Sequence, residues 1–446
     1  MFIPLADIPS LPNGRPTITL PFQLDLSGVA GLLGGDDTVS AMTAVHVYGN
    51  WRSLGWYNNP GSFQIAKRLS SLAKSVSFHG NSSQIFSSKS VYIDHTTSLS
   101  ELGQCKGPKF RAAHSGTVIE ETSYLAALFM KECAAWVSEG KVVQGRRTQP
   151  IGITIADLGQ APAPEMRPAC SSVFTLLFAS APISVSLVSC ALCAALEDWY
   201  ASSLILIGIV ASGVSCHVLG LADFVFTHPE PAKGSPAGDG ILTSDKDIVL
   251  LRGTEGAVNS ITRGRFSLRF LSRAHLKLVW WCSFLFFIQC ITQLLLIPQA
   301  SLFGQVMFLT SLGVSALYNA WLSSLDEEKI HRRMLFEGVL ENPTLTKYTL
   351  GTRTSAVVFI LLVLRPQDPT KLLNELLPND TKVWKVWKAT ILEQLHQPMN
   401  ESFLSDSKLG GVDGFTQQEQ DLLCLLYEDA RAAYNGYRDY LPVDAL

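Results

Sequence analysis

The sequence predicts a mainly α-helical membrane protein: four transmembrane helices form two antiparallel hairpins, with mixed α/β cytoplasmic regions at the N- and C-terminal ends. Charged residues make up 16% of the 446 residues, against about 25% in soluble domains. The apolar residues concentrate between positions 172 and 324. The first and second apolar runs are joined by a very short link, and so are the third and fourth. Such short links predict that the helices of each pair form an antiparallel hairpin.

Four runs lack any Asp, Glu, Lys or Arg, and they cover residues 172–196, 201–222, 278–298 and 302–325. Because a helix rises about 1.5 Å per residue, crossing about 30 Å of hydrocarbon takes about 20 apolar residues. Strands of a soluble core are far shorter than these runs. We therefore expect four transmembrane helices, with lipid as the immediate surroundings.

The distribution of Lys and Arg predicts the orientation. The turns at 197–200 and 298–301 carry none, whereas the loop 228–277 is rich in both. The positive-inside rule then places that basic loop, an N-terminal region 1–168 and a C-terminal domain 326–446 in the cytoplasm. We expect a multi-pass protein with both termini cytoplasmic, without a cleaved signal peptide, in an organelle that the sequence does not specify.

Small residues recur at every fourth position of the first two spans, which predicts that these helices pack closely through those faces. The residues are Pro182, Ser186, Cys190 and Ala194 in the first span and Gly208, Ser212, Cys216 and Gly220 in the second. Cys190 and Cys193 have CxxC spacing, but inside an apolar run we interpret them as packing residues.

Periodicity and turn signals predict the elements outside the spans. The expected helices cover 62–76, 118–139, 378–395 and 422–440, and the expected strands cover 91–93, 151–155 and 248–251. The helix 118–139 would begin at a capping box of Thr117 and Glu120. The helix 378–395 could lie on the cytoplasmic leaflet or pack on its own domain. Residues 355–364 read as a buried strand, with a fifth span or re-entrant segment as the alternative.

Four basic residues at four-residue spacing lead into the third span: Arg265, Arg269, Arg273 and Lys277. On a helix these residues would form one basic stripe. The alternative for the first half, beginning at Arg265, is a β-strand. The stripe is a candidate contact for anionic lipid, each cation contributing about 1 kcal/mol near such a surface. The competing interpretation is that these charges only set the orientation.

Five His, Gln or Asn residues lie inside the spans, where hydrocarbon makes such side chains costly. They are His217, Gln289, Gln293, Gln305 and Asn319. They could line a pathway for a solute or proton, with His217 titrating. The interpretation we favour is interhelical hydrogen bonds, worth about 0.6 kcal/mol each.

The sequence contains no HExxH, GxxxxGK[ST], GxSxG or GxGxxG motif, so we predict no catalytic residue, cofactor or metal site. A net charge of −3 argues against nucleic acid as a partner. We expect a non-enzymatic scaffold or regulatory protein that binds lipid or protein partners, or a second copy of itself, through its cytoplasmic parts. The alternative is a small transporter or channel subunit with a polar pathway around His217.

The region 245–395 resembles an uncharacterised family of fungal, basidiomycete-like multi-pass membrane proteins. The resemblance rests on Ser301-Leu-Phe-Gly-Gln, Tyr318-Asn319, Ser323-Ser-Leu-Asp326, Gly351-Thr-Arg-Thr354 and Leu376-Leu-Pro-Asn-Asp380. It implies a membrane protein of fungal source and no particular chemistry.

Overall fold

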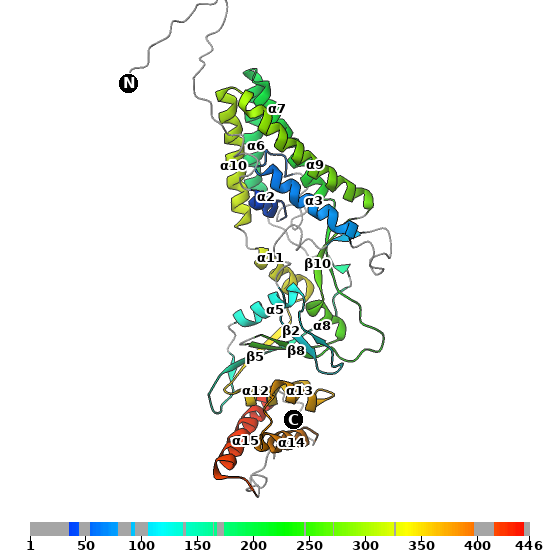
Figure 1. Cartoon of the computed structure of the whole chain (residues 1–446), viewed down its shortest axis with the longest axis vertical. Helices are drawn as coiled ribbons and strands as arrows, with labels where there is room; N and C mark the ends of the chain where they lie inside the picture. The colour runs from blue at the N-terminus through cyan, green and yellow to red at the C-terminus, as the bar shows by residue number, and fades with distance from the viewer. Residues whose placement is uncertain are drawn as a thin grey trace, which may run out of the picture.

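The computed structural model describes residues 35–43, 54–78, 91–93, 106–136, 140–163, 165–166, 174–244, 247–270, 272–324, 327–396 and 414–440. These residues form three successive layers along the long axis of the molecule (Figure 1). A helical bundle lies at one end, a mixed sheet lies in the middle, and a compact group of helices lies at the other end.

The bundle contains the four predicted long apolar helices. They are α6 (Phe174–Ala195), α7 (Trp199–Leu219), α9 (Arg273–Leu296) and α10 (Leu302–Ser323). All four are long and apolar enough to cross a membrane, which confirms this part of the sequence prediction.

Two further helices, which the sequence did not place among the spans, belong to the bundle. Helix α6 packs on α7 and α10, and α7 packs on α9, while α9 and α10 diverge from their shared turn (Figure 1). Helix α2 (Gly35–Met42) packs on α10, and α3 (Ser62–Phe78) packs on α9. We call residues 35–43 and 54–78 the inserted segment.

A seven-stranded sheet combines strands from all three regions outside the spans, in the order β3-β2-β8-β9-β5-β11-β4. The first region supplies β2 (Lys109–Ala112), β3 (Val118–Ile119), β4 (Lys141–Val142) and β5 (Ile151–Asp157). The basic loop supplies β8 (Gly240–Thr243) and β9 (Asp247–Arg252), and β11 (Thr344–Leu350) follows the fourth span. Strand β5, next to the central strand β9, runs parallel to β9 and antiparallel to β11.

A smaller sheet in the order β1-β10-β7-β6 lies between the bundle and the large sheet. Its strands are β1 (Val91–Ile93), β6 (Glu165–Met166), β7 (Asp223–Thr227) and β10 (Arg265–Phe270). Strand β7 follows α7 after a short turn, and β10 leads into α9. The antiparallel pair β7–β10 therefore continues two bundle helices toward the large sheet.

Side-chain alternation along the central strands separates two cores, because successive residues of a strand point to opposite faces. Val249 and Leu251 belong to a core that continues into α3, α7 and α9, whereas Ile153 and Leu250 belong to the core beneath the C-terminal helices. The bundle-side face also carries α5 (Tyr124–Ala135), α8 (Glu255–Thr262), α11 (Glu327–Arg333) and the π-helix Met334–Val339. The large sheet and the bundle therefore share one continuous apolar core.

The opposite face of the sheet carries α12 (Arg353–Leu364), α13 (Pro369–Leu376), α14 (Lys382–His396) and α15 (Gln417–Arg438). The strand predicted for 355–364 is wrong, because this run is the helix α12. All residues from Thr354 to Leu364 are buried, so a helix apolar on every side reads like a buried strand in the sequence. Helix α12 packs on the sheet and on α15, which separates it from the bundle (Figure 1).

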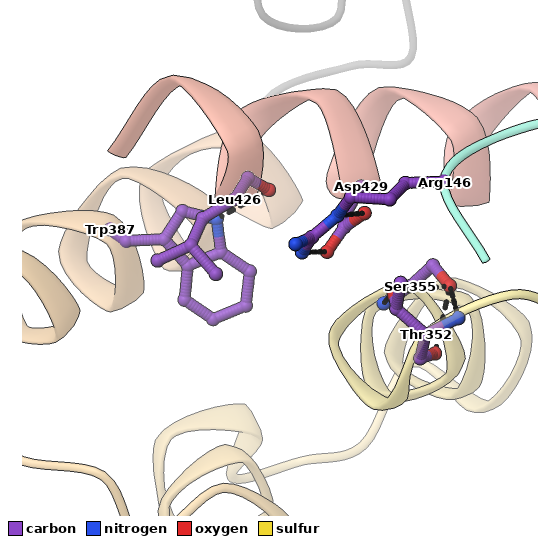
Figure 2. A network of polar contacts seen from close by, with 6 residues as sticks. All are labelled: Arg146, Thr352, Ser355, Trp387, Leu426 and Asp429. Atoms are coloured by element: carbon purple, nitrogen blue, oxygen red, sulfur yellow. Dashed lines mark hydrogen bonds and ion pairs between the residues drawn. The ribbon is translucent and has the colours of Figure 1, made fainter. Parts of the chain in front are cut away.

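Two polar contacts hold α15 in place (Figure 2). Nε1 of Trp387 on α14 donates to the carbonyl oxygen of Leu426 at 3.0 Å. A nitrogen of the Arg146 guanidinium lies 2.7 Å from a carboxylate oxygen of Asp429. Helix α14 thus packs on its own domain, with Trp387 fully buried.

Two other predicted details are wrong. Helix α5 begins at Tyr124 after the N-cap residue Ser123, and Val118 lies in strand β3 because it pairs with Arg111. Helix α15 begins at Gln417, five residues before the expected start, and its apolar residues Leu422 and Leu425 are exposed.

We expect Arg146→Ala to lower the stability of the C-terminal layer by about 2 kcal/mol. Asp429 is 2% exposed, and removing one partner of a buried ion pair strands the other charge. Arg146 itself is partly solvated, which reduces the loss. The midpoint of thermal unfolding tests this, with the exposed Arg438→Ala as control. Equal midpoints for the two variants would contradict it.

Candidate functional site: a polar centre inside the helical bundle

The inserted segment brings irregular backbone into the middle of the bundle. Residues 54–61 lie between α6, α7, α9 and α10, and Asn58 and Asn59 make the deepest contacts. Their partners Ser186, Ser212 and Ser311 lie near the middle of their helices. Both asparagines are fully buried.

Asn58 and Asn59 bond to serines of three helices. The backbone N–H of Asn58 donates to Oγ of Ser186 at 3.0 Å, and its Nδ2 donates to Oγ of Ser311 at 2.9 Å. Nδ2 of Asn59 donates to Oγ of Ser212 at 2.6 Å. Loop backbone is tolerated at membrane depth only where protein satisfies its polar groups, and these bonds meet that condition.

Asn319 of α10 bonds to both parts of the inserted segment, residues 35–43 and residues 54–78. Its Nδ2 donates to Oγ1 of Thr38 at 3.0 Å and to Oδ1 of Asn59 at 3.1 Å. Its Oδ1 accepts a hydrogen bond from the hydroxyl of Tyr57 at 3.0 Å. Asn319 is fully buried, so this predicted intramembrane residue anchors the inserted segment.

Two glutamines of α9 approach from the other side. Nε2 of Gln289 donates to the carbonyl oxygen of Asn59 at 3.4 Å, and Oε1 of Gln293 accepts from the hydroxyl of Ser62 at 3.3 Å. Ser62 is the first residue of α3. We call the buried polar groups gathered here the polar centre. Its members are Tyr57, Asn58, Asn59, Ser62, Ser186, Ser212, Gln289, Gln293, Ser311 and Asn319.

The small residues of α7 make room for the inserted segment. A Cβ on Gly208 would overlap Oδ1 of Asn58, and a Cβ on Gly213 would overlap the ring of Trp56. Helices α6 and α7 do pack on each other, as the small-residue pattern predicts. Ser186 and Ser212 of that pattern, however, bond to the inserted segment.

The other two predicted intramembrane residues lie outside the polar centre. His217 is exposed in the last turn of α7. Nε2 of Gln305 donates to the carbonyl oxygens of Ile297 and Ala300 at 3.3 and 3.1 Å, and so it closes the turn between α9 and α10. The structure thus brings together Gln289, Gln293 and Asn319 and separates His217 from them.

The four basic residues before the third span do not form one helical stripe. Arg265 and Arg269 lie in strand β10, and Arg273 begins helix α9, so the strand alternative holds for the first half. Arg269 forms an ion pair with Asp223 at 3.0 Å. Arg265 and Lys277 are exposed, and they remain the candidates for lipid contact whose side chains face outward.

Asp198 connects the two turns at the end of the bundle away from the sheet. Its Oδ1 accepts from the N–H of Ala201 at 3.1 Å, which caps α7. Its Oδ2 accepts from the N–H of Ser301 at 2.9 Å and from that residue's hydroxyl. One buried carboxylate therefore stabilises the starts of both α7 and α10.

At the sheet-side end, Glu327 holds the inserted segment to α11. Its Oε1 accepts from Oγ of Ser40 at 2.7 Å. Burial raises the pKa of this carboxyl, and the Ser40 hydroxyl opposes that shift in part. On the same helix, Glu328 pairs with Lys131 and Arg332 pairs with Glu132, which fixes α11 to α5.

We expect Glu327→Gln to raise the thermal midpoint at neutral pH and to have no effect at pH 4. A carboxyl whose folded pKa is raised costs stability once the pH exceeds its ordinary pKa, and glutamine avoids that cost. Ser40→Ala removes the opposing hydrogen bond, so it should lower the neutral midpoint. Melting curves between pH 4 and neutral pH test both variants. If the difference in midpoint between Glu327→Gln and wild type does not change with pH, the raised pKa of Glu327 is refuted.

Within the described ranges, the structure contains no group of three or more His, Cys, Asp or Glu side chains that could hold a metal ion. No family model matches the chain, and neither a curated protein nor a solved structure matches it. The resemblance of 245–395 to a fungal family therefore stays a prediction.

Sequence reasoning missed the inserted part of the polar centre because residues 54–62 read as an ordinary turn before a soluble helix. One signal could have revealed it. Buried polar residues recur at every fourth position of α10, at Ser311, Ser315 and Asn319. A single helix face with this many polar groups requires a polar partner.

Proposed function

We propose that the chain is a non-enzymatic multi-pass membrane protein that acts as a scaffold or regulator. The observation that carries this proposal is the large sheet, to which all three regions outside the spans contribute strands. A shared apolar core joins this sheet to the bundle. Such a platform suits the binding of lipid or protein partners beside a membrane.

The orientation that we propose places the platform and both termini in the cytoplasm, with the spans as two antiparallel hairpins. Support comes from the Lys and Arg content of the platform regions and its absence from the two turns. A glycosylation acceptor inserted at 197–198 should then receive glycan, and the same acceptor inserted at Gly234 should not. The reverse pattern would overturn the orientation.

The partner surface that we propose includes α15, because Leu422 and Leu425 are exposed there. The full chain in nanodiscs is the correct bait, since residues 1–168 or 326–446 alone lack the central strand β9. We expect specific capture of a protein that the double variant Leu422→Glu/Leu425→Glu does not retain. A set of captured proteins identical to that of empty nanodiscs would contradict the scaffold function.

Anionic lipid is the second partner that we propose, through Arg265 and Lys277. The exposed Trp280 and Trp281 on the next turn of α9 suit the membrane interface. Arg265→Gln/Lys277→Gln should retain less phosphatidylserine in native mass spectrometry than the control Lys233→Gln, whose side chain is also exposed. Equal retention of phosphatidylserine by the two variants would contradict lipid binding by Arg265 and Lys277. Their role would then be to set the orientation of the chain in the membrane.

A second candidate function is a small transporter or channel subunit. The polar centre favours it, because amide and hydroxyl groups meet near the middle of the four helices. The pathway would then pass Asn58 and Gln289, because His217 is exposed elsewhere. Flux through proteoliposomes should therefore persist in His217→Ala, and its loss in that variant would restore the histidine to the pathway.

A further inference from the structure

Three buried amide groups of the polar centre keep one polar atom without a hydrogen-bond partner among the described residues. These atoms are Oδ1 of Asn58, Oε1 of Gln289 and Nε2 of Gln293. Their side chains are 0%, 0% and 1% exposed. Leaving a buried polar group without a hydrogen-bond partner is unfavourable, so three such groups together indicate an occupant.

Exchanging oxygen and nitrogen within an amide does not remove these free positions. The Asn58 amide contacts Ser311 at one end, and the Gln293 amide contacts Ser62 at one end. Gln289 must present its nitrogen to the carbonyl oxygen of Asn59, which leaves its oxygen free. Each amide therefore keeps one free position in either orientation.

The chemistry of the polar centre selects a neutral occupant. None of its ten members is Asp, Glu, Lys, Arg or His, so no side chain can compensate an ionic charge. The N-terminus of α3 at Ser62 disfavours a cation. The free oxygens of Asn58 and Gln289 disfavour an anion. A small neutral molecule that both donates and accepts hydrogen bonds matches the chemistry of the three free atoms.

A polar face of α10 continues from the polar centre toward the sheet. Ser311, Ser315, Asn319 and Ser323 share this face, and α2 covers it, since Asn319 donates to Thr38 and Ser323 donates to Asp37. Toward the two turns, an apolar cluster that includes Leu204, Ile209 and Phe308 packs the bundle. The site is therefore enclosed on both sides, as an occluded site is, and a solute would enter only when α2 moves from α10.

We propose that the polar centre binds a small neutral solute bearing hydroxyl or amide groups, at Asn58, Gln289 and Gln293. This inference deepens the transporter alternative and rests on it, while the scaffold function is independent of it. The free amide atoms supply two acceptors and one donor.

Counterflow of labelled acetamide, urea and glycerol into proteoliposomes of the full chain tests this proposal. Acetate and ethylammonium, which are close to acetamide in size, report on charge. Wild type should accumulate at least one neutral probe above empty liposomes. Gln289→Met and Gln293→Met keep the side-chain volume but lose the amide, so each should reduce uptake about tenfold, the equivalent of about 1.4 kcal/mol.

Gln305→Met is the matched control, because Gln305 is also buried and also keeps a free amide oxygen, but it bonds within the turn between α9 and α10 and lies outside the polar centre. It should retain uptake. Each variant is accepted only if its elution volume and thermal midpoint show a folded protein. Neutral uptake at the level of empty liposomes, or unchanged in both folded methionine variants, would overturn the proposal. Preferential uptake of acetate or ethylammonium would overturn the neutral class and leave transport itself intact.

Discussion

Gly208→Val is expected to expel residues 54–61 from the bundle and to destabilise the protein by about 3 kcal/mol. Even a Cβ at this position would overlap Oδ1 of Asn58. Asn58 cannot move aside alone, because its backbone N–H and its side chain bond to two different helices. Relief of the overlap therefore requires displacement of the loop.

A cysteine pair at 62 and 293 measures this displacement, since Oγ of Ser62 lies 3.3 Å from Oε1 of Gln293 in the native protein. A short bifunctional thiol reagent should cross-link this pair in an otherwise wild-type chain and should fail to do so when Gly208→Val is added. Gly313→Val is the matched control, because a Cβ there meets no atom within 4 Å. Retained cross-linking in Gly208→Val would show that the inserted segment does not depend on this close approach.

Asp198→Ala is expected to lower stability by about 3 kcal/mol. The substitution removes the acceptor for the N–H of Ala201 and for both donors of Ser301. Loss of an N-cap costs about 1 kcal/mol, and stranded donors at a buried position add to that. The effect should combine fraying of α7 and α10 with separation of the two turns.

Asp198→Asn separates these contributions, because it keeps one oxygen as an acceptor and loses the other. We expect its thermal midpoint to lie between those of wild type and Asp198→Ala, with protease cleavage within 297–301 increasing in the same order. If Asp198→Ala had the wild-type midpoint, this would contradict the role of the Asp198 carboxylate in stabilising the starts of both α7 and α10.

The spans were predictable because they need no tertiary information. Length, lack of charge and short links define α6, α7, α9 and α10 directly. Local strand signals such as those of β5 and β9 were also readable. Their pairing was not, because β5 finds its neighbours in two other regions of the chain, and alternation within one strand says nothing about its partner.

The polar centre was predictable only in part, for a physical reason. Gln289 and Asn319 stand out in hydrocarbon-length runs, since an amide there needs an explanation. Asn58 and Asn59 do not stand out in a polar turn. Their burial depends on the space that Gly208 and Gly213 leave, and sequence position alone does not connect residues so far apart.

Helix α12 was misread because complete burial removes the polar stripe that identifies a helix. Its capping box is readable only once Thr352 and Ser355 are seen to exchange hydrogen bonds. The β-branched residues Val357 and Val358 then reflect packing on all sides, and they say little about backbone preference.

The order of the strands in the large sheet determines how the chain can be built. Strand β5 is synthesised before any span, but its neighbours β9 and β11 follow the second and the fourth span. One edge of β5 stays unpaired until β9 has been made, and the other stays unpaired until β11 has been made. Such open edges favour association with other chains. Completion of the sheet must therefore wait until the fourth apolar helix has left the ribosome, and an incomplete chain keeps an edge with which other chains can pair.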